Sequence, residues 1–156
     1  MQRIIVTIAL ALACTVNAET ITGQVVGVAD GDTITVLDVD KVQHKIRLAG
    51  IDAPEKKQPF GNRSRQSLAA VCFQKPATVS TVNKDRYDRT VGYVVCAGTD
   101  AQTHQVSTGM AWVYDRYSKP SSPLYALQSA AKAARAGLWA DKEPIPPWEW
   151  RRKPKP

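Results

Sequence analysis

The sequence predicts a single α+β domain in which five short strands form a small barrel or curled sheet alongside three helices. A chain of 156 residues is long enough for one domain with one core. Segments rich in Val, Ile and Thr dominate its first half, whereas the clearest helical pattern comes near its end. Five strands with a helix inserted after the third fit a five-stranded, partly open barrel.

Three strands are expected before the inserted helix and two after it. The turn residues Asp30-Gly31-Asp32 and the segment 38–41 separate the first three, which indicates a meander. A charged turn at residues 84–89 separates the last two. The expected strands are residues 21–28, 33–39, 44–48, 79–82 and 91–96.

The expected helices are residues 62–73, 102–110 and 122–138. The last has the strongest pattern, because its apolar residues recur at helical spacing. Ser122 is its expected N-cap, Pro123 lies in its first turn, and Gly137 ends it.

The chain divides into a leader, a domain and a tail. Residues 1–18 have the pattern of a secretory signal peptide, with an apolar stretch that ends in small residues. Lipoprotein processing at Cys14 is the rival interpretation, although the residues before it are in the wrong order for the usual lipoprotein box. We expect cleavage after Ala18, export to the periplasm or the medium, and no membrane span afterwards. The domain is then 19–143, and the basic, Pro- and Trp-rich tail 144–156 is expected to be extended.

Export changes what the cysteines mean. Once the leader is removed, Cys72 and Cys96 are an even pair in an oxidising compartment, which favours a disulfide over two buried free thiols. Two cysteines, with His44 and His104 sixty positions apart, do not form a zinc site.

The formal net charge of +7 favours a polyanionic partner. The alternative is that the basic surface only keeps the protein soluble. A charged fraction of 22% argues against a disordered polymer.

Three charged segments, residues 30–33, 47–55 and 85–89, suggest a catalytic site when they are taken together. Separately, they are explained by a hairpin turn, a strand end before a proline turn, and a charged hairpin tip. Together they supply hard oxygen ligands without His or Cys, which suits Ca²⁺ or Mg²⁺, and arginines that pair with phosphate. Phosphodiester hydrolysis needs these parts. The set is Asp32, Arg47, Asp52, Glu55 and Arg89.

These segments resemble the motifs of the staphylococcal nuclease family, and the resemblance runs from about residue 21 to 151. The matching segments are Asp30-Gly31-Asp32-Thr33, Arg47, Asp52-Ala53-Pro54-Glu55, Asp85-Arg86-Tyr87-Asp88-Arg89, Val91-Gly92-Tyr93, Gly109-Met110-Ala111-Trp112, Gly137-Leu138-Trp139-Ala140 and Pro146-Pro147-Trp148-Glu149-Trp150.

The resemblance implies an OB-like five-stranded barrel and a Ca²⁺-dependent nuclease, and a monomer is the default expectation. Its substrates would be single- and double-stranded DNA and RNA, and its products would carry 3′-phosphate ends. By motif position, Asp32 and Asp52 correspond to the calcium carboxylates, and Ala53 would bind the ion through its backbone carbonyl. Asp30 would support this metal site from outside it.

The same resemblance assigns the remaining roles. Glu55 would orient or deprotonate the attacking water, and Arg47 and Arg89 would grip the phosphate and stabilise the transition state. Tyr87, Tyr114 and Tyr117 would line the nucleotide site.

The sequence departs from the family pattern at two positions of the site. Ala53 stands where some members have Thr, which a backbone ligand tolerates. Asp88 stands where Gly is common; Asp tolerates left-handed geometry, but its charge is expected to weaken phosphate binding at Arg89.

Two other functions are possible on these residues. One is a catalytically silent OB-like module that binds nucleic acid, and the intact set of carboxylates and arginines argues against it. The other is an envelope interaction protein whose basic tail binds an acidic surface; deletion of the tail would then abolish its function.

Overall fold

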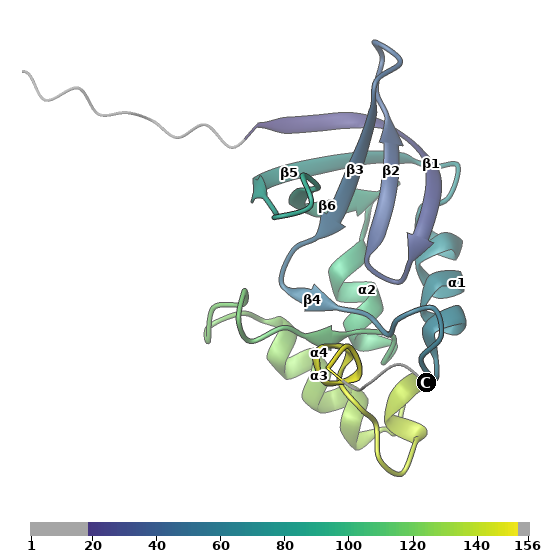
Figure 1. Cartoon of the computed structure of the whole chain (residues 1–156), viewed down its shortest axis with the longest axis vertical. Helices are drawn as coiled ribbons and strands as arrows, with labels where there is room; N and C mark the ends of the chain where they lie inside the picture. Colours follow the sequence, from purple (N-terminus) through teal and green to yellow (C-terminus); the bar gives the residue numbers. More distant parts are fainter. Residues whose placement is uncertain (1–18, 153–156) are drawn as a thin grey trace, which may run out of the picture.

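The computed structural model describes residues 19–152, and it shows a β-barrel beside a layer of helices (Figure 1). The predicted signal peptide and Cys14 lie outside the described residues. The strands are β1 (Thr20–Asp30), β2 (Thr33–Leu37), β3 (Gln43–Leu48), β4 (Ile51–Asp52), β5 (Pro76–Lys84), β6 (Thr90–Cys96), β7 (Thr99–Asp100) and β8 (Trp112–Val113). The helices are α1 (Gly61–Cys72), α2 (Ala101–Ser107), α3 (Leu124–Ala133), the 3₁₀ turn η1 (Gly137–Ala140) and α4 (Pro147–Trp150).

The sheet closes on itself. Its strands follow the order β3-β2-β1-β5-β6-β7, and β3 also pairs with β6 in parallel, so that β1, β2, β3, β5 and β6 form a closed barrel. The short strands β4 and β8 pair with each other outside it. Within the described residues three helices have seven residues or more. The predicted α+β, OB-like five-stranded barrel with three helices is therefore confirmed.

The last long helix is shorter than predicted. It ends at Ala133, because Arg135 adopts a left-handed conformation (φ 51°) and the Ala136 N–H donates to the carbonyl of Ala131. This is the hydrogen-bond pattern that closes many helices. Its N-cap is Pro123 rather than the predicted Ser122.

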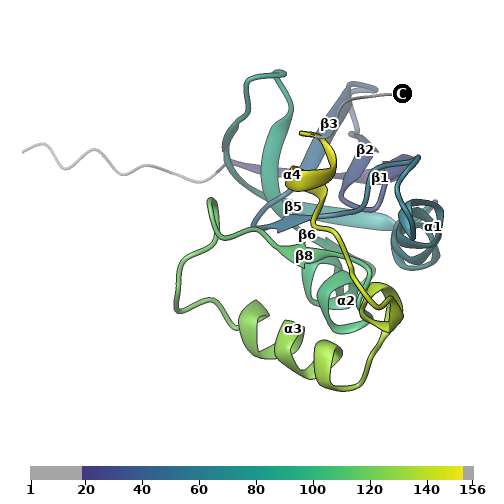
Figure 2. The ribbon, with the colours of Figure 1, turned by 60° about the horizontal axis from the view of Figure 1, so that its bottom comes forward.

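The C-terminal segment was predicted to be extended, but part of it is helical. Residues Pro147–Trp150 form the helical turn α4, with Pro147 at a first-turn position where proline needs no hydrogen-bond partner for its nitrogen. Figure 2 shows this segment in yellow, returning from the helices toward the barrel. No helix within residues 19–152 is long and apolar enough to cross a membrane.

The core fills the barrel and extends to the inner faces of α1 and α2. Ile34, Ile46 and Val94 are fully buried inside the barrel, and Leu68 contributes the buried face of α1. A disulfide joins Cys72 and Cys96, as predicted, and so links the end of α1 to the end of β6. The helix that borders the site is thereby fastened to the barrel.

Replacing both cysteines, as Cys72→Ala with Cys96→Ala, should lower the free energy of unfolding by about 3 kcal/mol, because the bridge closes a 24-residue loop in the unfolded chain. Urea unfolding of the oxidised protein and the double variant measures the difference. Reduced wild-type protein serves as the control and should match the variant. Equal stabilities of the oxidised and reduced protein would contradict this role of the disulfide.

Candidate functional site

A tight turn places the first carboxylate at the mouth of the barrel. Asp32 follows Gly31 between β1 and β2, and a Cβ at Gly31 would lie 1.8 Å from Ser64 Oγ, so that only glycine fits. From α2, the fully buried Gln105 donates its Nε2–H to the carbonyls of Gly31 (2.7 Å) and Ser64 (3.0 Å). The two helices therefore hold the turn in place. Sequence reasoning did not identify Gln105.

Arg47 is the centre of the site. It lies on β3 opposite Thr33, and its Nη1 donates to the carbonyls of Leu48 (3.0 Å) and Ile51 (2.8 Å). Its Nη2 donates to Asp52 Oδ1 at 2.9 Å, while Nη1 lies 3.3 Å from Asp32 Oδ2. One guanidinium thus bridges the carboxylate of the β1–β2 turn and the carboxylate of β4.

The two carboxylates are also linked through the backbone. The Ala53 N–H donates to Asp32 Oδ2 at 2.7 Å, and the Thr33 hydroxyl donates to Asp32 Oδ1 at 3.0 Å. Asp32 is 5% exposed, Asp52 is 1% exposed, and Ala53 is buried beside them. The predicted metal residues Asp32, Asp52 and Ala53 therefore lie together.

Burial makes negative charge costly here. It raises the pKa of Asp30 to about 6, and the neighbouring charge of Asp32 adds to the shift. Burial and Asp32 likewise raise the pKa of Asp52, against the opposing effects of Arg151 and Arg47. Burial by itself would lower the pKa of Arg47, but the carboxylates of Asp32 and Asp52 raise it above its ordinary value. The site is a crowded acidic cluster that binds positive charge.

Glu55 stands at the outer edge of this cluster, in the loop between β4 and α1. Gln58 fixes that loop: its backbone N–H donates to the Glu55 carbonyl (2.8 Å), and its side-chain oxygen accepts from the Glu55 N–H (3.1 Å). A Cβ at Gly61 would lie 2.0 Å from the Glu55 carbonyl oxygen, so that the helix start packs directly on the loop. The Glu55 side chain is 42% exposed and faces solvent beside two buried carboxylates.

Arg89 approaches the cluster from the loop between β5 and β6. Asp85 holds it, accepting from Arg89 Nε at 2.8 Å and lying 2.7 Å from Nη2. Its Nη1 lies 3.4 Å from Thr33 Oγ1, whose hydroxyl bonds to Asp32. The carboxylate of Asp88 pairs with Lys84 at 2.8 Å and not with Arg89, and Asp88 adopts the left-handed conformation expected of it (φ 59°). The acidic neighbour of Arg89 is therefore Asp85.

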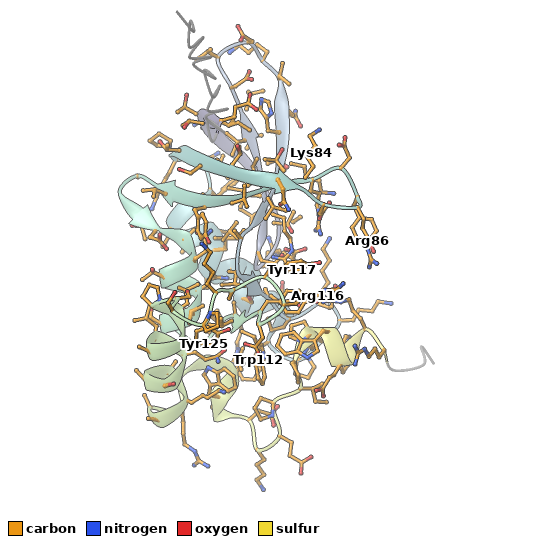
Figure 3. The ribbon with its side chains drawn as sticks, turned by 90° about the vertical axis from the view of Figure 1, so that its left-hand side faces the viewer. Lys84, Arg86, Trp112, Arg116, Tyr117 and Tyr125 are labelled. Carbon is orange, nitrogen blue, oxygen red and sulfur yellow. A yellow bond between two sulfur atoms is a disulfide. The ribbon has the colours of Figure 1, made fainter. Side chains whose placement is uncertain are left out.

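The three predicted tyrosines lie in two places. Tyr87 is 66% exposed at the tip of the β5–β6 loop, with the Arg89 guanidinium 5.5 Å from its ring centre. Tyr114 follows β8 and contacts Tyr117 edge-on at 5.1 Å. Figure 3 shows Lys84 and Arg86 of the loop on the same side of the molecule as Arg116. Aromatic rings and cations thus flank the acidic cluster.

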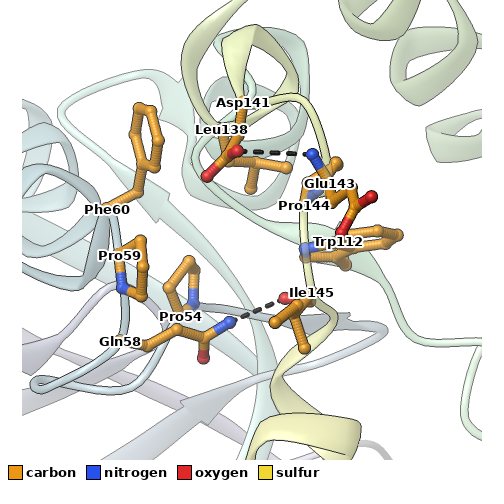
Figure 4. A pocket seen from close by; sticks show the side chains of 10 residues that line it. All are labelled: Pro54, Gln58, Pro59, Phe60, Trp112, Leu138, Asp141, Glu143, Pro144 and Ile145. Atoms are coloured by element: carbon orange, nitrogen blue, oxygen red, sulfur yellow. Dashed lines mark hydrogen bonds between the residues drawn. The ribbon is translucent and has the colours of Figure 1, made fainter.

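The C-terminal segment also reaches the site, which sequence reasoning missed. Arg151 Nη2 lies 2.6 Å from Asp52 Oδ2, and Arg151 Nη1 lies 2.7 Å from Glu55 Oε1. These contacts join residues 96 to 99 positions apart, so no local sequence pattern predicts them. Beside them, the segment Asp141–Ile145 and the loop Pro54–Phe60 enclose a small pocket, across which Gln58 Nε2 donates to the Ile145 carbonyl at 2.7 Å (Figure 4).

The donor set fits a hard divalent cation. Among residues 19–152, no three His, Cys, Asp or Glu side chains are arranged as a metal cluster, so an ion here would depend on two carboxylates, a backbone carbonyl and water. Carboxylate and carbonyl oxygens are ligands of Ca²⁺ and Mg²⁺. The outward oxygens of Asp52 and Glu55 already bind a positive group, the guanidinium of Arg151. Positive charge is therefore stable at this position.

Comparison with known proteins gives concordant matches. A family model described as "Staphylococcal nuclease homologue" matches residues 45–141. The chain is 43% identical over 135 residues to an "Uncharacterized endonuclease" of Haemophilus influenzae, which covers 86% of this chain and 75% of that protein. It is 42% identical over 143 residues to a "Micrococcal nuclease" of Shigella flexneri, covering 85% and 82% of the two chains. A "Staphylococcal-like nuclease CAN1" of Arabidopsis thaliana is 39% identical over 108 residues, covering 69% of this chain and 33% of that protein.

Asp30→Asn should stabilise the metal-free protein at pH 7 by about 1–3 kcal/mol, because it removes a charge whose burial raises the pKa from 3.8 to about 6. A raised carboxyl pKa means that the folded state holds the proton more tightly. Stability of the wild type is therefore lost as the pH rises from about 4 to about 6, and the variant lacks this loss.

Urea unfolding in a chelator between pH 4 and 7 measures the effect of Asp30→Asn. Asp40→Asn is the control, because Asp40 is exposed in the turn after β2. The same stability difference at both ends of this pH range would contradict the expectation.

Proposed function

The chain belongs to the staphylococcal nuclease family, and from this premise we propose that it is an exported, Ca²⁺-dependent nuclease. It hydrolyses phosphodiester bonds in single- and double-stranded DNA and in RNA, leaves 3′-phosphate ends, and works as a monomer in the periplasm or the medium. The observation that carries the proposal is the Asp32–Arg47–Asp52 cluster, with the exposed Glu55 at its outer edge.

Asp32, Asp52 and the Ala53 carbonyl would hold the Ca²⁺, which supplies charge neutralisation at the scissile phosphate when bound. Asp32 and Asp52 are buried and held by Thr33, Ala53 and Arg47, so that their oxygens are fixed before any ligand arrives. A preorganised site does not spend binding energy on ordering its own ligands. Asp30 supports the turn by accepting the Asp32 N–H at 3.1 Å.

Arg47 and Arg89 stabilise the negative charge that builds up on the phosphate oxygens. A guanidinium has five N–H donors, and the three hydrogen bonds of Arg47 leave two of them for a phosphate. Arg89 is 22% exposed and anchored by Asp85, and its Nη1 lies 3.4 Å from the Thr33 hydroxyl beside Asp32. Fixed donors of this kind are worth most where water is excluded.

Glu55 takes the proton of the attacking water. Its side chain is exposed enough to contact water, and its loop is fixed by Gln58. As the water oxygen bonds to phosphorus, the bond from phosphorus to the 5′ oxygen breaks, and that oxygen takes a proton from solvent and leaves as a hydroxyl. Glu55 then returns its proton to solvent. The phosphate stays on the 3′ oxygen. Base stacking on Tyr87, Tyr114 and Tyr117 would tolerate either sugar and any base.

Digestion of single-stranded DNA tests the proposed function. The wild type should cleave it with Ca²⁺, stop in a Ca²⁺-selective chelator and leave 3′-phosphate ends. Arg89→Ala should lose roughly 10²-fold in rate, the scale for removing one preorganised donor. Arg86→Ala is the matched control, since Arg86 is exposed three positions away and its guanidinium lies over the Tyr87 ring. Cleavage that persists in the chelator, or binding without cleavage, would argue for another function.

Glu55→Gln should lower turnover by roughly 10² to 10⁴-fold, because the amide cannot accept the proton. The melting temperature should stay close to that of the wild type, since the Glu55 side chain is exposed. Steady-state cleavage and thermal unfolding measure the two quantities. Glu19→Gln, at an exposed glutamate immediately before β1, is the control. Normal turnover in a folded Glu55→Gln protein would rule out this role.

A further inference from the structure

We propose that Arg151 of the C-terminal segment is an internal competitor of the divalent cation at the Asp52–Glu55 edge, an inference that rests on the proposed metal-dependent function. Both terminal guanidinium nitrogens are engaged: Nη2 lies 2.6 Å from Asp52 Oδ2, and Nη1 lies 2.7 Å from Glu55 Oε1. A metal bound to Asp52 and a water activated by Glu55 need these same oxygens. The Arg151 contact and the catalytic arrangement therefore exclude each other.

Arg151 is delivered by a docked segment. Upstream, Gln58 Nε2 donates to the Ile145 carbonyl at 2.7 Å, and Pro147 is buried. On α4, Trp148 stacks on Tyr114 with ring centres 5.2 Å apart and planes 18° apart, and it meets Trp112 edge-on at 5.8 Å. These contacts keep the guanidinium at a high effective concentration beside the carboxylates.

The contact is nevertheless exchangeable. The Arg151 side chain is 43% exposed, whereas that of Arg47 is 14% exposed and bonded to two backbone carbonyls. Arg47 is therefore a fixed part of the cluster, and Arg151 can turn into solvent. The pair is not a surface one, because the Asp52 carboxylate is buried, but a divalent ion carries twice the charge of the guanidinium and can displace it. The apparent metal affinity is then reduced by the fraction of molecules in which Arg151 occupies the edge.

The C-terminal segment that carries Arg151 also places Trp148 over the face of Tyr114, one of the rings predicted to line the nucleotide site. Both the cation position and a stacking surface are thus covered by one eight-residue stretch, 144–151. This segment acts as a self-inhibitory strap that metal and substrate together displace.

The experiment is a calorimetric titration of the full chain with Ca²⁺, and separately with Mg²⁺ and Mn²⁺, for the wild type, Arg151→Ala, Arg151→Lys and Arg152→Ala. Arg151→Ala should bind the cation about tenfold more tightly, since the competing group is gone. Arg151→Lys keeps the charge without the planar fork and should fall between it and the wild type. Arg152→Ala removes the same charge from the exposed neighbouring residue and should bind like the wild type.

The outcomes separate the two proposals. Unchanged or weaker cation binding by Arg151→Ala, or an equal gain in Arg152→Ala, would overturn the competition. A loss of cleavage by Arg151→Ala at saturating Ca²⁺ would also overturn it and would identify Arg151 as a phosphate ligand. If Ca²⁺ does not bind but Mn²⁺ or Mg²⁺ does, and binds more tightly to Arg151→Ala, the competition stands and the Ca²⁺-dependent function fails. If none of the three ions binds to any variant, the competition is wrong.

Discussion

The structure around the site depends on one constraint, which is that two buried carboxylates must share a fixed positive charge. Asp32 comes from the β1–β2 turn and Asp52 from β4, and without Arg47 their mutual repulsion in a buried position would be unopposed on the inner side. The pairing of β2 with β3 sets Thr33 opposite Arg47 and so places the guanidinium beside Asp32. Barrel closure between β3 and β6 brings the Arg89 loop to the same end. The fold therefore serves to assemble this charge arrangement.

Buried polar side chains from α1, α2 and the loop between β4 and α1 fix the segments that carry the carboxylates. Gln105 and Ser64 hold the turn that carries Asp32, and Gln58 holds the loop that carries Glu55. Each of these side chains is buried, so that losing its partner would leave polar groups unpaired in the interior. The rigid inner half of the site contrasts with its outer half, where Glu55 and Arg151 are exposed. We propose that phosphodiester hydrolysis takes place between the buried inner half and the exposed outer half of the site.

Local patterns predicted the barrel strands and the long helices because alternation, turn residues and helical spacing act over a few residues. The resemblance of short motifs supplied the set of carboxylates and arginines that the fold brings together. Contacts between distant segments have no such signal: Arg151 on Asp52 and Gln105 under Gly31 depend on how the chain closes. The end of α3 was misplaced because the left-handed Arg135, and not Gly137, stops that helix.

The most direct test of the account is a crystal structure of the protein with Ca²⁺ and a nucleoside 3′,5′-bisphosphate. The account predicts that the cation contacts the carboxylates of Asp32 and Asp52 and the carbonyl of Ala53, with phosphate oxygens on Arg47 and Arg89. It also predicts that the Arg151 guanidinium has left Asp52. A cation bound elsewhere, or Arg151 still paired with Asp52 beside the bound metal, would contradict it.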